Sequence, residues 1–157
     1  MKVAAVRDAT AARKAPIPRP STSDVLDAFD HAGDVAGREL KPGDFRWKYL
    51  GKLNIEQLSA YDDFGSWLDI DPKEAAAMTP WERIHELEHF RGIPWATRAS
   101  AWGARGIPPI VIVSVPDEDG RVATMIADGR GRTNFVALTG KSVHAWHAIH
   151  RSIRGWK

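Results

Sequence analysis

The sequence predicts a single α+β domain with a small mixed sheet and helices packed on one side of it. Three patterns support this fold class. Phe45, Trp47 and Tyr49 alternate along FRWKYLGKL, which is typical of a strand. Two apolar runs rich in β-branched residues flank the turn sequence PDEDG, which predicts a hairpin. A helix-start signature stands at Thr79. The chain thus holds strands and helices in succession.

The composition is that of a folded chain without thiol chemistry. The 157 residues suit one domain of ordinary size plus a tail, and 43% of them are hydrophobic, enough for a core. The absence of cysteine excludes disulfides, thiolate zinc sites, iron–sulfur ligation and thiol nucleophiles. No run approaches the roughly 20 apolar residues that cross a bilayer, and no cleavable leader is recognisable. We therefore expect a cytoplasmic protein that does not enter a membrane.

The net charge of +2 hides an uneven distribution. Counting Lys, Arg, Asp and Glu, residues 1–20 carry a net charge of +4, residues 21–90 of −8 and residues 91–157 of +6. The basic C-terminal part suits a phosphate-bearing partner, because positive regions attract and steer anions. Charge alone names no activity.

The elements up to residue 67 follow from local signals. Residues 1–23 are rich in Pro, Ala and basic residues without a period, which predicts a flexible basic arm before a single domain at 24–157. SDVLDAFDHAG predicts a short capped helix that Gly33 ends. The strand at 45–53 comes next, and residues 54–67 predict another short helix with Leu58, Tyr61 and Trp67 as apolar anchors.

Thr79 begins the clearest helix. It is the N-cap, Pro80 takes the first helical position and Glu82 completes a capping box. The period directs four apolar side chains inward, namely Trp81, Ile84, Leu87 and Phe90. The helix should stop near residues 92–94, and a second helix is expected at 97–105, ended by Gly106.

The C-terminal third predicts a hairpin, a helix and a last strand. PPIVIVSV and RVATMIA pair across PDEDG, so residues 108–127 form the hairpin. A helix begins at Thr133 or one residue earlier, spans to Leu138 and ends at Thr139-Gly140. SVHAWHAIH at 142–150 favours a strand over a helix, with Val143, Ala145, His147 and Ile149 on its inner side.

The loop between the hairpin and this helix is the candidate site. Gly129 and Gly131 let the backbone come close to a ligand, and the first turn of a helix leaves amide N–H groups without internal partners. Such a terminus favours phosphate, and Arg130 and Arg132 add guanidinium groups that grip phosphate oxygens. Thr133 completes the predicted phosphate site at Gly129–Thr133. Asp128 either holds Mg²⁺, accepts a proton or caps the turn.

The stretch PPIVIVSVPDEDGRVATMIADGRGRTNFVALTG resembles the core of the ParB/sulfiredoxin superfamily, with a match over about residues 92–150. The shared features are a Pro-led strand, a hairpin, a Gly-Arg loop and a short helix that ends in Gly. The resemblance makes Gly129 the loop glycine, Arg132 the phosphate-binding arginine and Asp128 the acidic position before them. Gly131 stands where many members have His. Arg130 stands where sulfiredoxins have their catalytic Cys, so sulfiredoxin chemistry is excluded.

The resemblance implies a compact member of the superfamily, of the kind that phages and plasmids carry. It implies nucleotide binding, nucleoside triphosphate hydrolysis or DNA cleavage, with Mg²⁺ as a candidate cofactor and a nucleotide or DNA as the partner. In a phosphoester hydrolase of this kind Asp128 and Arg132 are the candidate catalytic residues. The chain lacks the long C-terminal helix-turn-helix region of chromosome-partition proteins.

Two alternatives stay open. One is a module that recognises phosphate on DNA or on a partner without catalysis. The other is a zinc peptidase, because His85-Glu86-x-x-His89 matches the H-E-x-x-H motif, whose two imidazoles lie on one helix face beside a general base. Against the zinc peptidase, Trp95 stands where the extended motif has its third ligand. His147 is a further candidate acid or base, if the last strand brings it near the Arg132 loop.

Overall fold

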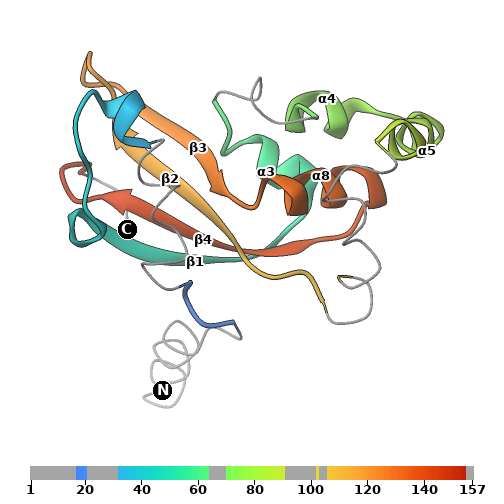
Figure 1. Cartoon of the computed structure of the whole chain (residues 1–157), viewed down its shortest axis with the longest axis horizontal. Coiled ribbons are helices and arrows are strands. Elements are labelled where there is room, and N and C mark those ends of the chain that lie inside the picture. The colour runs from blue at the N-terminus through green and yellow to red at the C-terminus, as the bar shows by residue number, and fades with distance from the viewer. Residues whose placement is uncertain (1–16, 21–31, 64–69, 91–101, 103–105, 155–157) are drawn as a thin grey trace, which may run out of the picture.

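The computed structural model describes residues 17–20, 32–63, 70–90, 102 and 106–154, built around a four-stranded sheet (Figure 1). The strands are β1 (Phe45–Leu53), β2 (Ile110–Pro116), β3 (Val122–Asp128) and β4 (Val143–His150). Their order in space is β1-β4-β2-β3. β4 is antiparallel to β1 and parallel to β2, whereas β2 and β3 form an antiparallel hairpin. The mixed sheet and the predicted strands are therefore confirmed.

β2 is buried on both faces of the sheet. Its side chains alternate, so Ile110 and Ile112 belong to one hydrophobic cluster while Val111 and Val113 belong to another. This explains why the sequence of β2 is a continuous apolar run rather than an alternating one.

Four helices lie on the side of the sheet that carries the first cluster. These are α3 (Ile55–Ser59), α4 (Pro72–Ala77), α5 (Pro80–His89) and α8 (Arg130–Thr139), which gather beside one another in Figure 1. The second cluster is covered by a helical segment at residues 32–36, through Ala32, Val35 and Ala36. The expectation that the helices pack on one side of the sheet is thus wrong, because alternating burial on β2 requires cover on both faces.

The predicted cap signals act as expected. The Thr79 hydroxyl accepts the Glu82 N–H at 3.2 Å, and the Glu82 carboxylate accepts the Thr79 N–H at 3.1 Å, which completes the capping box of α5. The hydrogen bonds of this capping box lower the pKa of Glu82, because both the backbone and the hydroxyl of Thr79 stabilise the charged carboxylate. Gly140 ends α8 in the left-handed conformation, as predicted.

Two details of the predicted helices are corrected. Trp81 and Ile84 are 67% and 53% exposed, and Leu87 is exposed too, so the apolar side of α5 does not face the core. Phe90 alone of that set packs against the first cluster. Gly33 does not end the first helix. Residues 32–36 are helical, and the turn comes at Gly37, whose φ of 70° a glycine adopts readily.

Part of the predicted arm lies on the domain. Arg19 stands over the ring of Trp47 at 5.1 Å from its centroid, a cation–π contact, while Ile17 and Pro20 line two surface hollows. Residues 17–20 of the predicted flexible arm thus contact the domain, and the flexibility of the arm stays a prediction.

Several predicted features fall outside the described residues. They are the remainder of the arm, the helix start at 23–31, the anchor Trp67, the helix stop at 92–94 and most of the helix at 97–105. Trp102 is helical, and the Gly106 N–H bonds to its carbonyl at 2.9 Å, in keeping with a helix that ends at Gly106. Among the described helices, none combines the length and the apolar character needed to cross a membrane.

Candidate functional site

The predicted phosphate loop is the first turn of α8 itself. The helix begins at Arg130, which corrects the predicted start at Thr133 or one residue earlier. Gly129 is its N-cap, with φ 110°, and a Cβ at this position would lie 2.3 Å from Cγ2 of Ile110. Only glycine fits here, because a side chain would meet both an unfavourable backbone conformation and a buried β2 residue.

Thr133 holds the turn together from inside. Its backbone N–H and its hydroxyl both donate to the Gly129 carbonyl, at 2.8 and 2.9 Å, and the residue is 0% exposed. The Thr133 hydroxyl thus serves the turn rather than facing a ligand. Gly129, the N-cap, has no side chain that could accept a hydrogen bond from the first-turn amides. The first-turn amides are the groups of a helix that anions satisfy.

Arg132 and Asp128 form a partly exposed pair beside these amides. Nη2 of Arg132 lies 3.1 Å from Oδ1 of Asp128, with side-chain exposures of 19% and 31%. Nη1 of Arg132 donates to the carbonyl of Pro109, so the guanidinium also secures the entry to β2. A guanidinium has five N–H donors, and these two bonds leave others for a ligand.

Asp128 and Arg132 face a surface hollow. Its volume is about 340 Å³, and its other lining residues are Pro20, Pro108 and Pro109. The structure thus brings two of the predicted site residues together at an open surface, and buries Gly129 and Thr133 behind them. Gly131 is half-buried within the first turn. Arg130 starts α8, but its side chain lies outside the described part of the chain.

A larger pocket adjoins this hollow. It has a volume of about 490 Å³ and shares Pro108 and Pro109 with the hollow. Its polar lining includes Lys52, Lys141 and His144, which come from two distant parts of the sequence, residue 52 and residues 141–144. Sequence reasoning missed the two lysines because no local pattern links them. The antiparallel pairing of β1 with β4, in which Lys52 stands opposite His144, brings these two parts of the chain together.

The histidines of β4 make contacts within the fold. Nε2 of His147 is 2.7 Å from the Ser114 hydroxyl on β2, which is itself 2.7 Å from the Thr124 hydroxyl. Burial, together with the nearby charge of Lys48, lowers the pKa of His147 to about 4. The imidazole is neutral at pH 7 and 1% exposed, which does not suit the acid–base role considered from the sequence.

His144 lies at the larger pocket. Its Nδ1 is 2.6 Å from the Tyr49 hydroxyl. Burial, and secondarily Lys52, lower the pKa of His144, and burial raises the pKa of Tyr49. Both side chains are therefore uncharged near neutral pH, and Lys52 and Lys141 supply the positive charge of the pocket.

The H-E-x-x-H motif lies on the exposed side of α5. His85 packs edge-on against Trp81 with ring centroids 4.5 Å apart, and His89 packs against Phe90 at 5.1 Å. Within the described ranges, no group of three or more His, Asp or Glu side chains is arranged to hold a metal ion. Among the described residues, the support for a zinc peptidase is therefore limited to the sequence motif itself.

The comparisons with protein-family models, with curated proteins and with solved structures find no match to this chain.

Proposed function

We propose that the chain binds the phosphate of a nucleotide or nucleic acid at the first turn of α8. The observation that carries this proposal is the Asp128–Arg132 pair, held beside the first turn of α8, whose N-cap is a glycine, at the edge of an open hollow. The amides carry the positive end of the helix dipole, and the guanidinium offers a planar fork of donors to phosphate oxygens. Neither group needs to move far, because Gly129, Thr133 and Pro109 fix the turn.

Asp128 fits a Mg²⁺-assisted arrangement. Proteins usually hold this ion with one or two carboxylates, several waters and the phosphates of the substrate. Asp128 is the acidic residue among the described lining of the hollow, so it would hold the ion together with a bound phosphate. Bound there, Mg²⁺ would neutralise charge on the phosphate oxygens. Arg132, the ion-pair partner of Asp128, would orient the same phosphate.

Recognition without catalysis is the second candidate, and one observation favours it. Arg132 already bonds to Asp128 and to the Pro109 carbonyl, so a phosphate would join an existing network instead of meeting a free guanidinium. Assays of nuclease and triphosphatase turnover, with and without Mg²⁺, separate the two candidates. Product formation that Asp128→Asn abolishes supports the hydrolase, and binding without product in either condition supports the module.

Calorimetric titration with nucleoside triphosphates and with DNA tests the site itself. We expect Arg132→Ala to weaken binding about 10- to 100-fold, because a hydrogen bond to a charged group contributes about 1.5–3 kcal/mol. Arg121→Ala is the matched control, since it removes the same charge from an exposed position on the hairpin. Arg132→Lys separates charge from geometry, because an ammonium keeps the charge without the fork. Equal affinities of the wild-type protein and Arg132→Ala would refute the site.

A further inference from the structure

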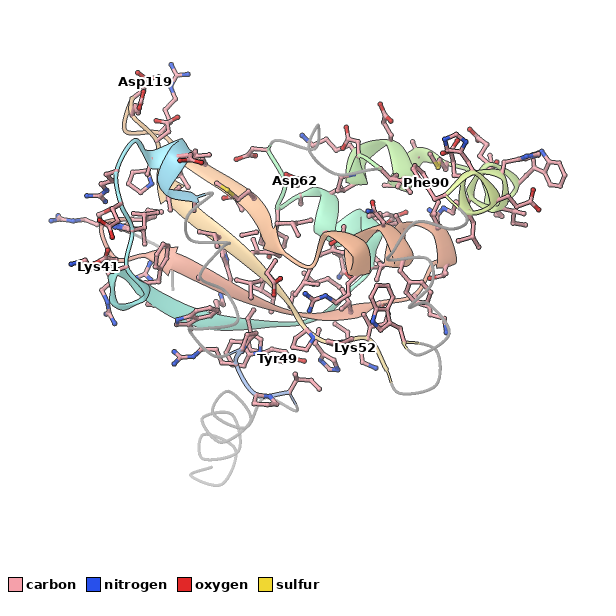
Figure 2. All side chains as sticks on the ribbon, in the orientation of Figure 1. Lys41, Tyr49, Lys52, Asp62, Phe90 and Asp119 are labelled. Atoms are coloured by element: carbon pink, nitrogen blue, oxygen red, sulfur yellow. The ribbon has the colours of Figure 1, made fainter. Side chains whose placement is uncertain are left out.

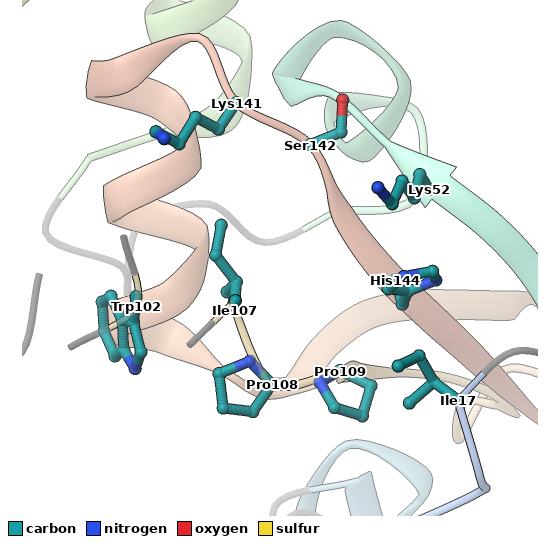
Figure 3. Close-up of a pocket in the computed structure, with 10 residues that line it drawn as sticks. Ile17, Lys52, Trp102, Ile107, Pro108, Pro109, Lys141, Ser142 and His144 are labelled. Carbon is teal, nitrogen blue, oxygen red and sulfur yellow. The ribbon is translucent and has the colours of Figure 1, made fainter. Parts of the chain in front are cut away.

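The larger pocket has the character of a ligand site. Figure 3 shows Trp102 on one side and Lys52 and His144 on the other, with Pro108 and Pro109 between them. The volume of about 490 Å³ lies within the roughly 300–1,000 Å³ typical of small-molecule sites. Its lining combines apolar rings with a few polar groups, which is the usual composition of such sites.

The charge of the pocket is one-sided. Lys52 and Lys141 line it, and no Asp or Glu does so among the described residues. Neither lysine forms an ion pair with another described side chain. The acidic hairpin tip, marked by Asp119 at the upper left of Figure 2, lies well away from Lys52, which is near the lower middle. Two unpaired ammonium groups at one cavity attract a multiply charged anion such as a phosphate.

Trp102 gives the pocket a rigid aromatic wall. Its indole packs edge-on against Phe135 of α8, with ring centroids 5.3 Å apart, so the core fixes its position. Tryptophan surfaces stack on planar rings, and stacking on a nucleobase contributes about 1–3 kcal/mol. The prolines and Ile107 add apolar surface between the indole and the lysines.

We propose that this pocket binds a nucleotide unit, with the base against Trp102 and the phosphate between Lys52 and Lys141. The ligand resembles that of the proposed function, but the site is a second one. Its lining includes none of the residues Asp128 to Thr133, so binding at this pocket can be tested separately from binding at the turn of α8. The shared Pro108 and Pro109 place the two sites side by side, where one strand of nucleic acid could contact both.

Calorimetry on the whole chain tests the proposal with four probes: a panel of the nucleoside monophosphates, ribose 5-phosphate, adenosine and a short single-stranded oligonucleotide. We expect the double variant Lys52→Ala/Lys141→Ala to lower the affinity for the bound nucleotide or oligonucleotide at least 10-fold. Lys41→Ala/Lys73→Ala is the matched control, because it removes two exposed lysines away from the pocket. Trp102→Leu should bring the affinity for the monophosphate down to that for ribose 5-phosphate, whereas Trp102→Phe should retain part of the difference.

The outcomes separate this pocket from the turn of α8. Arg132→Ala should leave the binding that depends on Lys52 and Lys141 within about twofold of the wild-type value. Binding of the monophosphates assigns the pocket to free nucleotides, and lysine-dependent binding of the oligonucleotide alone assigns it to a strand. The proposal is overturned if none of the nucleotide probes binds, or if the variant without Lys52 and Lys141 binds them as tightly as the control variant.

Discussion

Acidification should destabilise the fold through His147. His147 lies on β4 and is 1% exposed, with the Ser114 hydroxyl of β2 at 2.7 Å and the Tyr61 ring edge-on at 5.7 Å between centroids. Protonation would place a charge in this enclosed site close to Lys48, which is why the pKa falls from 6.5 to about 4. The unfolded chain binds the proton more readily than the folded one. Stability present above pH 6.5 is therefore lost as the pH falls toward 4.

The size of the effect follows from the two pKa values. At pH 4.5 the unfolded imidazole is almost fully protonated, whereas the folded one is mostly neutral. Proton linkage then gives a loss of about 2.5 kcal/mol relative to pH 7.5, at 1.36 kcal/mol for each pKa unit. This is a large part of the roughly 5–15 kcal/mol by which domains are stable.

Urea unfolding at pH 7.5 and at pH 4.5 measures the loss. His147→Gln keeps a polar side chain but no titrating group, so its own loss between the two pH values should be about 2.5 kcal/mol smaller than that of the wild-type protein. Groups elsewhere titrate in both proteins and cancel from the comparison. His85→Gln is the control, because His85 is exposed on α5, and it should retain the wild-type loss. An equal loss in the wild-type protein and His147→Gln would refute the reasoning.

Two further predictions concern single positions and are read from thermal or urea unfolding. Gly129→Ala should lower the free energy of unfolding by about 3 kcal/mol, because it adds a clash with Ile110 to an unfavourable φ. Gly51→Ala, with φ +87° and open space around it, should lower that free energy by only about 1 kcal/mol. Equal losses in the two variants would exclude the clash. Trp81→Ser should change the free energy of unfolding by no more than about 0.5 kcal/mol, because the side chain is 67% exposed. Phe135→Ala, at a position that is 5% exposed, should lower it by about 3–5 kcal/mol. A loss above about 2 kcal/mol at Trp81 would show that α5 packs against more than the described residues.

The parts of the fold that depend on local chemistry were predictable from the sequence. Three examples are the alternation at Phe45–Leu53, the hairpin around PDEDG and the capping box at Thr79. In each of them the interacting residues are only a few positions apart, so the sequence pattern shows the interaction directly. The burial of the α5 side chains was not predictable in this way. Helical period defines which residues share a face, but what packs against that face depends on tertiary contacts. α4 passed unnoticed, although Asp71-Pro72 is a cap followed by a proline at the first helical position.

The same distinction applies to the site. Gly129 at a sharp turn and Arg132 near a helix start were readable, since both follow from the order strand, glycine, helix. The partners of Arg132 were harder to predict from the sequence. Asp128 lies one helical turn away, but the Pro109 carbonyl is 23 residues distant along the chain. Lys52 and Lys141 line the same pocket because β1 and β4 are neighbours, which a sequence without comparison to relatives does not reveal.

The position of β4 has a consequence for how the molecule is made. β4 follows the other three strands of the sheet along the chain, yet it lies in the middle of the sheet, where it joins β1 to the β2–β3 hairpin. Until residues 143–150 emerge, the nascent protein holds one solitary strand and one hairpin, each with apolar side chains and an open edge. Such edges invite association with other chains. Synthesis that stalls before residue 143 should therefore yield an aggregation-prone fragment, and a chaperone that shields these edges would be needed until residues 143–150 have emerged.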